Sequence, residues 1–150
     1  MTSLSVRSSL RLTAFVPFRL NRLAEAVSEE LALIYRARFG LEVGTWRVLA
    51  TVGAERTCTA QFIAASTRMH KTRVSRAIAE LLTRGLLEHG TGSRDRREQP
   101  LRLAPAGRRL YTQLVPLVLA REAQLLGCLA EAERRAFLSA LAKLESHLRL

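Results

Sequence analysis

The pattern of apolar residues between positions 71 and 84 limits the fold of this chain more than any other feature. Five apolar residues follow the i, i+3, i+4, i+7, i+8 spacing of an amphipathic helix: Val74, Ala77, Ile78, Leu81 and Leu82. At about 100° per residue these side chains share one face, and polar residues occupy the opposite face. The sequence therefore predicts a helix over 71–84 that packs on a core, presents a polar surface to a partner and ends at Gly85.

Helices are also predicted on the N-terminal side of this segment. Apolar residues recur at three- and four-residue steps across 17–38, which indicates a long amphipathic helix that ends near Gly40. Shorter apolar patterns predict helices over 45–52 and 59–66, the second with Thr59 as its N-cap. Two short helices joined by a tight turn, as expected between 59 and 84, form a helix-turn-helix.

A small hairpin and two long helices are predicted on the C-terminal side. Segments 86–89 and 101–103 are expected as strands, because the residues between them have turn composition and Leu101 and Leu103 alternate with Arg102. Pro100 is expected to confine the second strand to a sheet edge, since proline lacks an N–H donor. Helices follow over about 105–126, with a kink at Pro116, and over 131–148. The predicted fold is mainly α with a small β-hairpin wing.

The net charge of +11 is concentrated in one part of the chain. Residues 66–102 contain nine Lys and Arg against four Asp and Glu, a net +5, whereas 1–65 and 103–150 each carry +3. Arginine supplies 22 of the 24 basic residues, and its planar guanidinium suits phosphates and base edges. A basic helix-turn-helix followed by a basic hairpin predicts double-stranded DNA as the partner, with the helix in the major groove and the hairpin tip in the minor groove.

Several other classes of protein are not favoured. The longest apolar run, 114–120, has seven residues against roughly 20 for a membrane span, and the N-terminus lacks a secretory pattern. Cys58 and Cys128 form neither a disulfide framework nor a zinc motif, and no catalytic set or cofactor-binding loop occurs. We therefore expect a cytoplasmic protein that is not an enzyme and has no metal, no cofactor and no membrane partner.

Three short motifs occur in a fixed order: Val74-Ser75-Arg76, Arg84-Gly85-Leu86 and Asp95-Arg96-Arg97. With the segments 40–50 and 101–107 they resemble the MarR family of dimeric winged-helix transcription regulators, and the resemblance covers nearly the whole chain. It implies a single domain, 1–150, in which a winged helix-turn-helix over about 43–104 is flanked by N- and C-terminal dimerisation helices, about 12–38 and 105–150.

The resemblance also implies which side chains contact DNA. It places Arg73 and Arg76 on the recognition helix, where they would contact bases or phosphates, and Arg97 on the wing, oriented by Asp95. The full expected set is Lys71, Thr72, Arg73, Ser75, Arg76, Arg94, Asp95, Arg96 and Arg97. A solvated helix face and a simple loop charge pair are the alternatives.

Three residues depart from the family's usual helix caps. His70 stands where the family often has Asp as the N-cap of the recognition helix, and imidazole is a poorer cap. Phe62 stands where a capping Glu is common, and Ala104 where Thr is usual before the next helix. These departures predict weaker caps within the same fold.

The resemblance further implies a homodimer and an effector. The terminal helices would interdigitate and bury the stripe Phe137, Leu141, Leu144 and Leu148, so that two recognition helices reach a pseudo-palindromic operator. A small aromatic or carboxylate ligand, or a thioester of one, would release a repressor from DNA. The candidate ligand-binding residues are Phe18, Arg19, Arg22 and Trp46, although Trp46 also suits a core and Arg19 a helix surface.

Two alternative functions stay open on sequence alone. Cys58 or Cys128 would make the chain a thiol-based, redox-responsive regulator. The basic charge would also suit a protein that binds DNA or RNA without sequence preference. Single-strand binding proteins stack bases on aromatic side chains, however, and none of the eight aromatic residues lies within 63–110.

Overall fold

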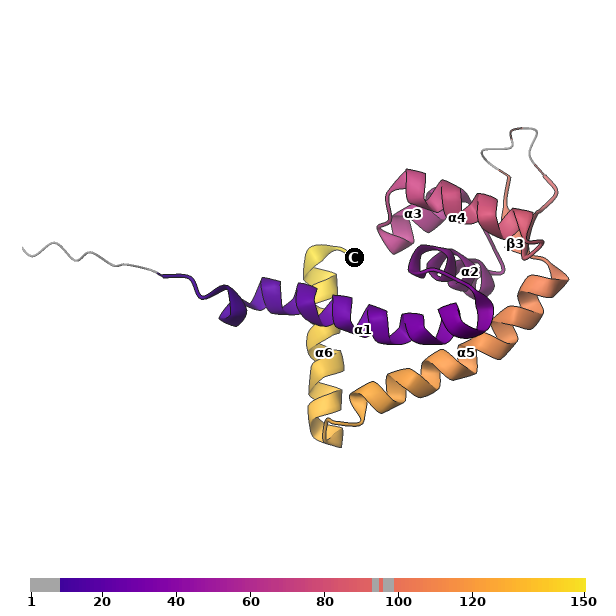
Figure 1. The fold of residues 1–150 in the computed structure, drawn as a ribbon. Helices are drawn as coiled ribbons and strands as arrows, with labels where there is room; N and C mark the ends of the chain where they lie inside the picture. The colour runs from indigo at the N-terminus through magenta and orange to yellow at the C-terminus, as the bar shows by residue number, and fades with distance from the viewer. Residues whose placement is uncertain (1–8, 93–94, 96–98) are drawn as a thin grey trace, which may run out of the picture.

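The computed structural model describes residues 9–92, 95 and 99–150 (Figure 1). These residues form a short 3₁₀ helix, η1 (Leu12–Ala14), six α-helices and three short strands. The α-helices are α1 (Val16–Phe39), α2 (Val43–Glu55), α3 (Ala60–Thr67), α4 (Lys71–Thr83), α5 (Pro105–Leu126) and α6 (Glu131–Leu148). The strands are β1 (Thr57–Cys58), β2 (Leu87–His89) and β3 (Leu101–Leu103).

The predicted helices are confirmed, with ends that differ from the expected ones by at most three residues. The end of α1 is set by Gly40, which has a φ of 60° and returns its amide to the carbonyls of Arg36 and Tyr35. The N-cap of α3 is Thr59, whose hydroxyl accepts from the amide of Phe62 at 3.2 Å. α5 runs through Pro116 as one helix.

The small sheet differs from the prediction in one respect. The strand order is β1-β3-β2, so β3 is the central strand and the prediction that Pro100 confines it to an edge was wrong. Pro100 precedes β3, so all three residues of the strand keep their amides for pairing with β1 on one side and β2 on the other. The two-residue strand β1 is too short to show an alternating pattern in the sequence.

The core forms where α4 packs on α2 and α3. As predicted, the apolar face of α4 is buried, with Val74 and Leu81 almost fully inaccessible, and Leu82 at its edge is half-buried. Other elements complete this core through fully buried side chains: Leu49 and Val52 of α2, Ile63 of α3, Tyr35 of α1 and Leu114 of α5. One continuous core therefore holds the recognition-helix candidate, the sheet and the C-terminal half of α1 together.

The sheet and α5 approach each other very closely at Gly107. A Cβ at this position would lie 1.9 Å from the carbonyl oxygen of Leu86, which is part of the backbone and cannot swing aside. The first turn of α5 is thereby seated directly on the chain that leads into β2.

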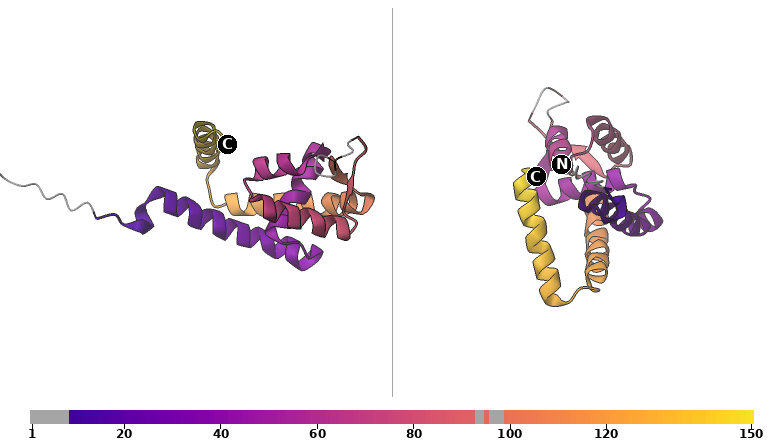
Figure 2. Two further views of the ribbon diagram at one scale, coloured as in Figure 1. Left: turned by 90° about the horizontal axis from the view of Figure 1, so that it is seen from above. Right: turned by 90° about the vertical axis from the view of Figure 1, so that its left-hand side faces the viewer.

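The terminal helices extend away from this core. α1 and α5 run side by side beneath the winged unit, and α6 stands apart from this unit in Figure 1 and in the left view of Figure 2. None of the residues of α6 is buried. In the part of the chain that is described, no single helix is long and apolar enough to cross a membrane. Only α5 and α6 taken together reach the length and apolar composition of a membrane span, and the two helices are bent by 112° relative to each other.

We expect Gly107→Ala to destabilise the fold strongly, because overpacking against fixed backbone costs about 1–3 kcal/mol or more. Chemical denaturation followed by circular dichroism measures the change in unfolding free energy. Ala123→Ser on the exposed side of α5 adds one heavy atom without such a neighbour and should change stability by less than about 0.5 kcal/mol. Equal stability of the Gly107 variant and the wild type would contradict this packing.

Candidate nucleic-acid interface

The N-terminal half of α4 presents a polar, basic surface to solvent. All five candidate residues on this helix are exposed: Lys71, Thr72, Arg73, Ser75 and Arg76. α4 lies beside α3 on the side of the molecule from which the hairpin also projects (Figure 1). The structure therefore brings the helical candidates together on one face, next to the wing.

The exposed face of α4 has a centre and an edge. At about 100° per residue, Thr72 and Arg76 lie near its centre, opposite the buried side chains. Arg73 lies nearer the edge that faces α2, and one of its guanidinium nitrogens would be 3.9 Å from a Cβ on Gly44. Arg76 is thus the arginine that points most directly away from the core, whereas Arg73 leans over the start of α2.

The start of α4 is capped by a histidine. The Nδ1 atom of His70 accepts a hydrogen bond from the amide of Thr72 at 3.2 Å. An imidazole nitrogen can accept only when it carries no proton, so a neutral His70 has its proton on Nε2. The expected weakness of caps holds at Ala104, which offers no side-chain cap to α5, whereas His70 does fill the N-cap role that Asp has in the family's usual pattern.

The hairpin expected to enter the minor groove is built on β2 and β3. Glu88 and Arg102 face each other across these strands, and their side chains form an ion pair at 2.7 Å. Asp95, which belongs to the connecting segment, is exposed. Three other candidate DNA-binding residues of this segment, Arg94, Arg96 and Arg97, lie outside the described residues.

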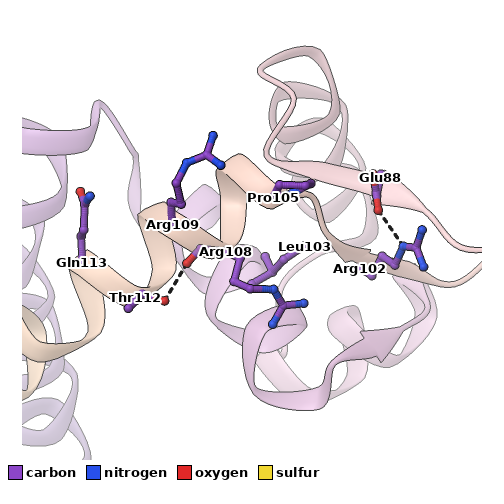
Figure 3. A pocket seen from close by; sticks show the side chains of 8 residues that line it. All are labelled: Glu88, Arg102, Leu103, Pro105, Arg108, Arg109, Thr112 and Gln113. Atoms are coloured by element: carbon purple, nitrogen blue, oxygen red, sulfur yellow. Dashed lines mark hydrogen bonds and ion pairs between the residues drawn. The ribbon is translucent and has the colours of Figure 1, made fainter.

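A second basic surface lies where the sheet meets α5 (Figure 3). An open hollow there is lined by Arg102 of β3 and by Arg108 and Arg109 of α5, around an apolar base that includes Leu103 and Pro105. The sequence reasoning did not single out these arginines. The adjacent pair Arg108-Arg109 in the first turn of a helix is the signal that could have found them.

The four candidate ligand-binding residues fall into two groups. Arg19 and Arg22 line a shallow hollow on the first turns of α1, and the guanidinium carbon of Arg22 lies 5.8 Å from the centre of the Phe18 ring. Trp46 does not line this hollow but stacks on Tyr35, with ring centres 5.8 Å apart and planes inclined by 20°. The structure therefore groups Phe18, Arg19 and Arg22 on α1, while Trp46 packs at the edge of the core.

The two cysteines have different surroundings. Cys58 is buried on β1, and burial together with the nearby charge of Glu55 raises the pKa of its thiol to about 11. Cys128 is exposed in the turn between α5 and α6. A peroxide-sensing thiol needs exposure and a low pKa, so the environment of Cys58 does not favour the redox alternative. Among the described residues, no group of three or more His, Cys, Asp or Glu side chains could hold a metal ion.

A recognition helix with an exposed basic face, a preceding short helix and a three-stranded wing define a winged helix-turn-helix protein. The sequence profile of the MarR family matches residues 39–98. Among solved structures, a MarR family transcriptional regulator from Silicibacter pomeroyi DSS-3 is 27% identical, with a TM-score of 0.81 over 93% of this chain and 99% of that one. The chain therefore resembles the MarR family of transcriptional regulators, in sequence over residues 39–98 and in fold over most of its length.

Two further structures share the fold at lower identity. Bordetella bronchiseptica BpsR, described with its regulation of DNA binding by 6-hydroxynicotinic acid, is 23% identical with a TM-score of 0.79, over 92% of this chain and 98% of that one. A putative MarR family regulator from Listeria monocytogenes in complex with a 26mer DNA is 19% identical with a TM-score of 0.76, over 87% and 86%. A comparison with curated proteins found no match.

The raised pKa of Cys58 predicts selective alkylation. At about pH 7.5 iodoacetamide should label Cys128 in the folded protein and leave Cys58 unmodified, because thiolate forms at Cys58 only as the pH approaches its pKa of about 11. Mass spectrometry of digested protein locates the label, and Cys128→Ser should abolish labelling until the chain is unfolded. Comparable labelling of both thiols in the native state would contradict the burial of Cys58.

Proposed function

We propose that the chain is a homodimeric repressor that binds a pseudo-palindromic DNA operator and is released from it by a small aromatic or carboxylate ligand. The observation that carries the proposal is the exposed basic face at the start of α4, held in fixed register by the burial of the opposite face. B-DNA's major groove admits an α-helix, and a helix N-terminus favours contact with phosphates. The DNA complex of the Listeria monocytogenes protein supports DNA as the partner class.

The proposed contacts divide by their place on the interface. Arg76, at the centre of the exposed face of α4, reaches a base edge in the major groove, and Thr72 and Ser75 bind phosphates and fix the register. Lys71 and Arg73 add positive charge along the same groove. The wing residues Arg94, Asp95, Arg96 and Arg97 contact the flanking minor groove.

The dimer half of the proposal rests on apolar surface that one chain leaves uncovered. On α6, Leu144 and Leu148 are 48% and 63% exposed, and on the first turns of α1, Val16 and Leu23 are 60% and 53% exposed. Most of the stability of a helix in a protein comes from packing of its apolar face, and α6 has no buried residue within one chain. A second copy that covers α6 and the start of α1 supplies this packing.

The ligand half rests on Arg19 and Arg22, which line the hollow on α1, and on Phe18, whose ring lies beside Arg22. Two guanidinium groups, one of them next to an aromatic ring, suit an aromatic carboxylate, which is the chemical class of 6-hydroxynicotinic acid, the compound named with BpsR. These residues lie on the same turns of α1 that would meet the partner chain. A ligand bound there would shift the spacing of the two recognition helices between forms that do and do not fit DNA.

We expect Arg76→Ala to weaken binding to the operator by about 10-fold to 100-fold and to relax specificity, because a base contact is worth about 1–3 kcal/mol. Fluorescence anisotropy measures the affinity for DNA that flanks the gene of this protein and the affinity for random DNA, each at several salt concentrations. Arg135→Ala removes the same charge from the face of α6 opposite its apolar residues, and this variant should bind DNA like the wild type.

The same assay tests the ligand. Addition of 6-hydroxynicotinic acid, benzoic acid or a benzoyl thioester should release the wild-type protein from the operator, whereas an Arg19→Ala variant should stay bound. Equal affinity of the wild type for operator and random DNA would support the non-specific alternative. Unchanged operator binding by Arg76→Ala would overturn the assignment of this side chain.

We expect Leu144→Glu to convert the dimer to a monomer, because each dimer would bury two carboxylates at a cost of several kcal/mol per ion. Size-exclusion chromatography with light scattering gives the mass of the particle. Ser139→Glu places the same charge on the opposite face of α6 and should remain dimeric. A wild-type chain that is monomeric at micromolar concentration would refute the dimer.

A further inference from the structure

The arginine of the Arg84-Gly85-Leu86 motif takes no part in the DNA contacts proposed above, yet it is tied to a distant part of the chain. Arg84 is the C-cap residue of α4. Its guanidinium Nη2 donates to the carbonyl of Phe39 at 2.7 Å, and Nη1 donates to the carbonyl of Gly40 at 3.1 Å. The end of the recognition helix is thus bonded to the end of α1, more than 40 residues earlier.

The same guanidinium is joined to α2 through Glu80. Nη1 of Arg84 lies 3.4 Å from one carboxylate oxygen of Glu80, and the other oxygen accepts from the hydroxyl of Thr45 at 3.0 Å. Thr45 is a polar residue of the core, 3% exposed. The polar contacts therefore form a chain from α2 through α4 to the end of α1.

This arrangement follows from the chemistry of helix ends. The last carbonyls of a helix lack partners within the helix and carry a partial negative charge, which a cation complements. A planar guanidinium can donate to two such carbonyls and a carboxylate at once, whereas a lysine ammonium is a point charge on a flexible stem. Glu80 and Arg84 stand one turn apart on the edge of α4 that faces α2.

We propose that Arg84, held by Glu80, is a positioning residue that fixes the direction of the recognition helix relative to α1. The inference rests on the proposed function, in which α1 belongs to the dimer interface. Apolar packing of α4 on α2 fixes which face is buried, but it is non-directional, whereas two hydrogen bonds to the backbone at the end of α1 constrain the direction of the helix. Arg84 thereby sets the spacing between the two recognition helices of a dimer without touching DNA.

The structure indicates that this role is one of geometry more than of stability. The side chains of Arg84 and Glu80 are 34% and 42% exposed, and ion pairs with that exposure contribute little to folding. Substitution should therefore leave a folded, dimeric protein in which each recognition helix still binds its own half-site. What is lost is the fixed relation between the two helices.

The test compares Arg84→Lys and Arg84→Gln with the wild type on two DNA duplexes, the full operator and a single half-site. We expect both variants to lose about tenfold in affinity for the full operator, within the usual range of coupling between sites, and less than about twofold for the half-site. Arg84→Lys keeps the charge, so its loss reflects geometry. The slope of affinity against salt should match that of the wild type, because no phosphate contact is removed.

Thr45→Val removes the hydroxyl that holds Glu80 and leaves Arg84 in place, and it should show a smaller loss with the same preference for the full operator. Thermal melting and light scattering establish that every variant compared is folded and dimeric. Full-operator binding by Arg84→Lys equal to that of the wild type, or an equal loss on the half-site, overturns the inference. A wild-type protein with no preference for operator over random DNA overturns the proposed function instead, before any variant is compared.

Discussion

Burial of one face of α4 against α2 and α3 is the interaction on which the rest of this structure depends. Val74, Ile78 and Leu81 each contribute about 1.5–3 kcal/mol when removed from water, and together they fix the rotation of the helix about its own axis. A slip of one residue would turn the helix by about 100° and expose this set. Burial of this face therefore determines which side chains of α4 are exposed to a partner, with Arg76 at the centre of the exposed face.

The sheet connects the packed core to the wing and to α5. β3 lies between β1 and β2, and the carbonyl of Leu86 lies against Gly107, so the base of the hairpin and the first turn of α5 form one packed unit. Leu86 follows α4 after only Arg84 and Gly85, and its amide donates back to the carbonyl of Leu81. The recognition helix, the wing and the start of α5 thus share a short stretch of backbone with little freedom to move separately.

The helices could be predicted from the sequence because each buries a face with a regular period, and caps such as Thr59 and Gly40 mark their ends. Features that depend on distant partners could not. β1 has two residues, too few for an alternating pattern, and the central place of β3 depends on β1 being there to pair with it. The contact of Arg84 with α1 joins residues 44 and 45 positions apart, and its sequence motif carries no sign of that partner.

The candidate site shows the same division. The exposed set on α4 follows from helical periodicity alone, so its placement was predictable. Trp46 and Arg19 were predicted to bind one ligand because of their side-chain types. Side-chain type does not determine which face of a helix a residue occupies, and in the structure Trp46 stacks on Tyr35. The spacing between the two recognition helices of the proposed dimer is harder still to predict from the sequence, because it depends on how two chains pack together. In the dimer that we propose, the two ends of α1 control this spacing: Arg84 binds the carbonyls at the C-terminal end, and a second chain would cover the exposed apolar side chains of the first turns, so that α1 would link the dimer contact to the DNA contact.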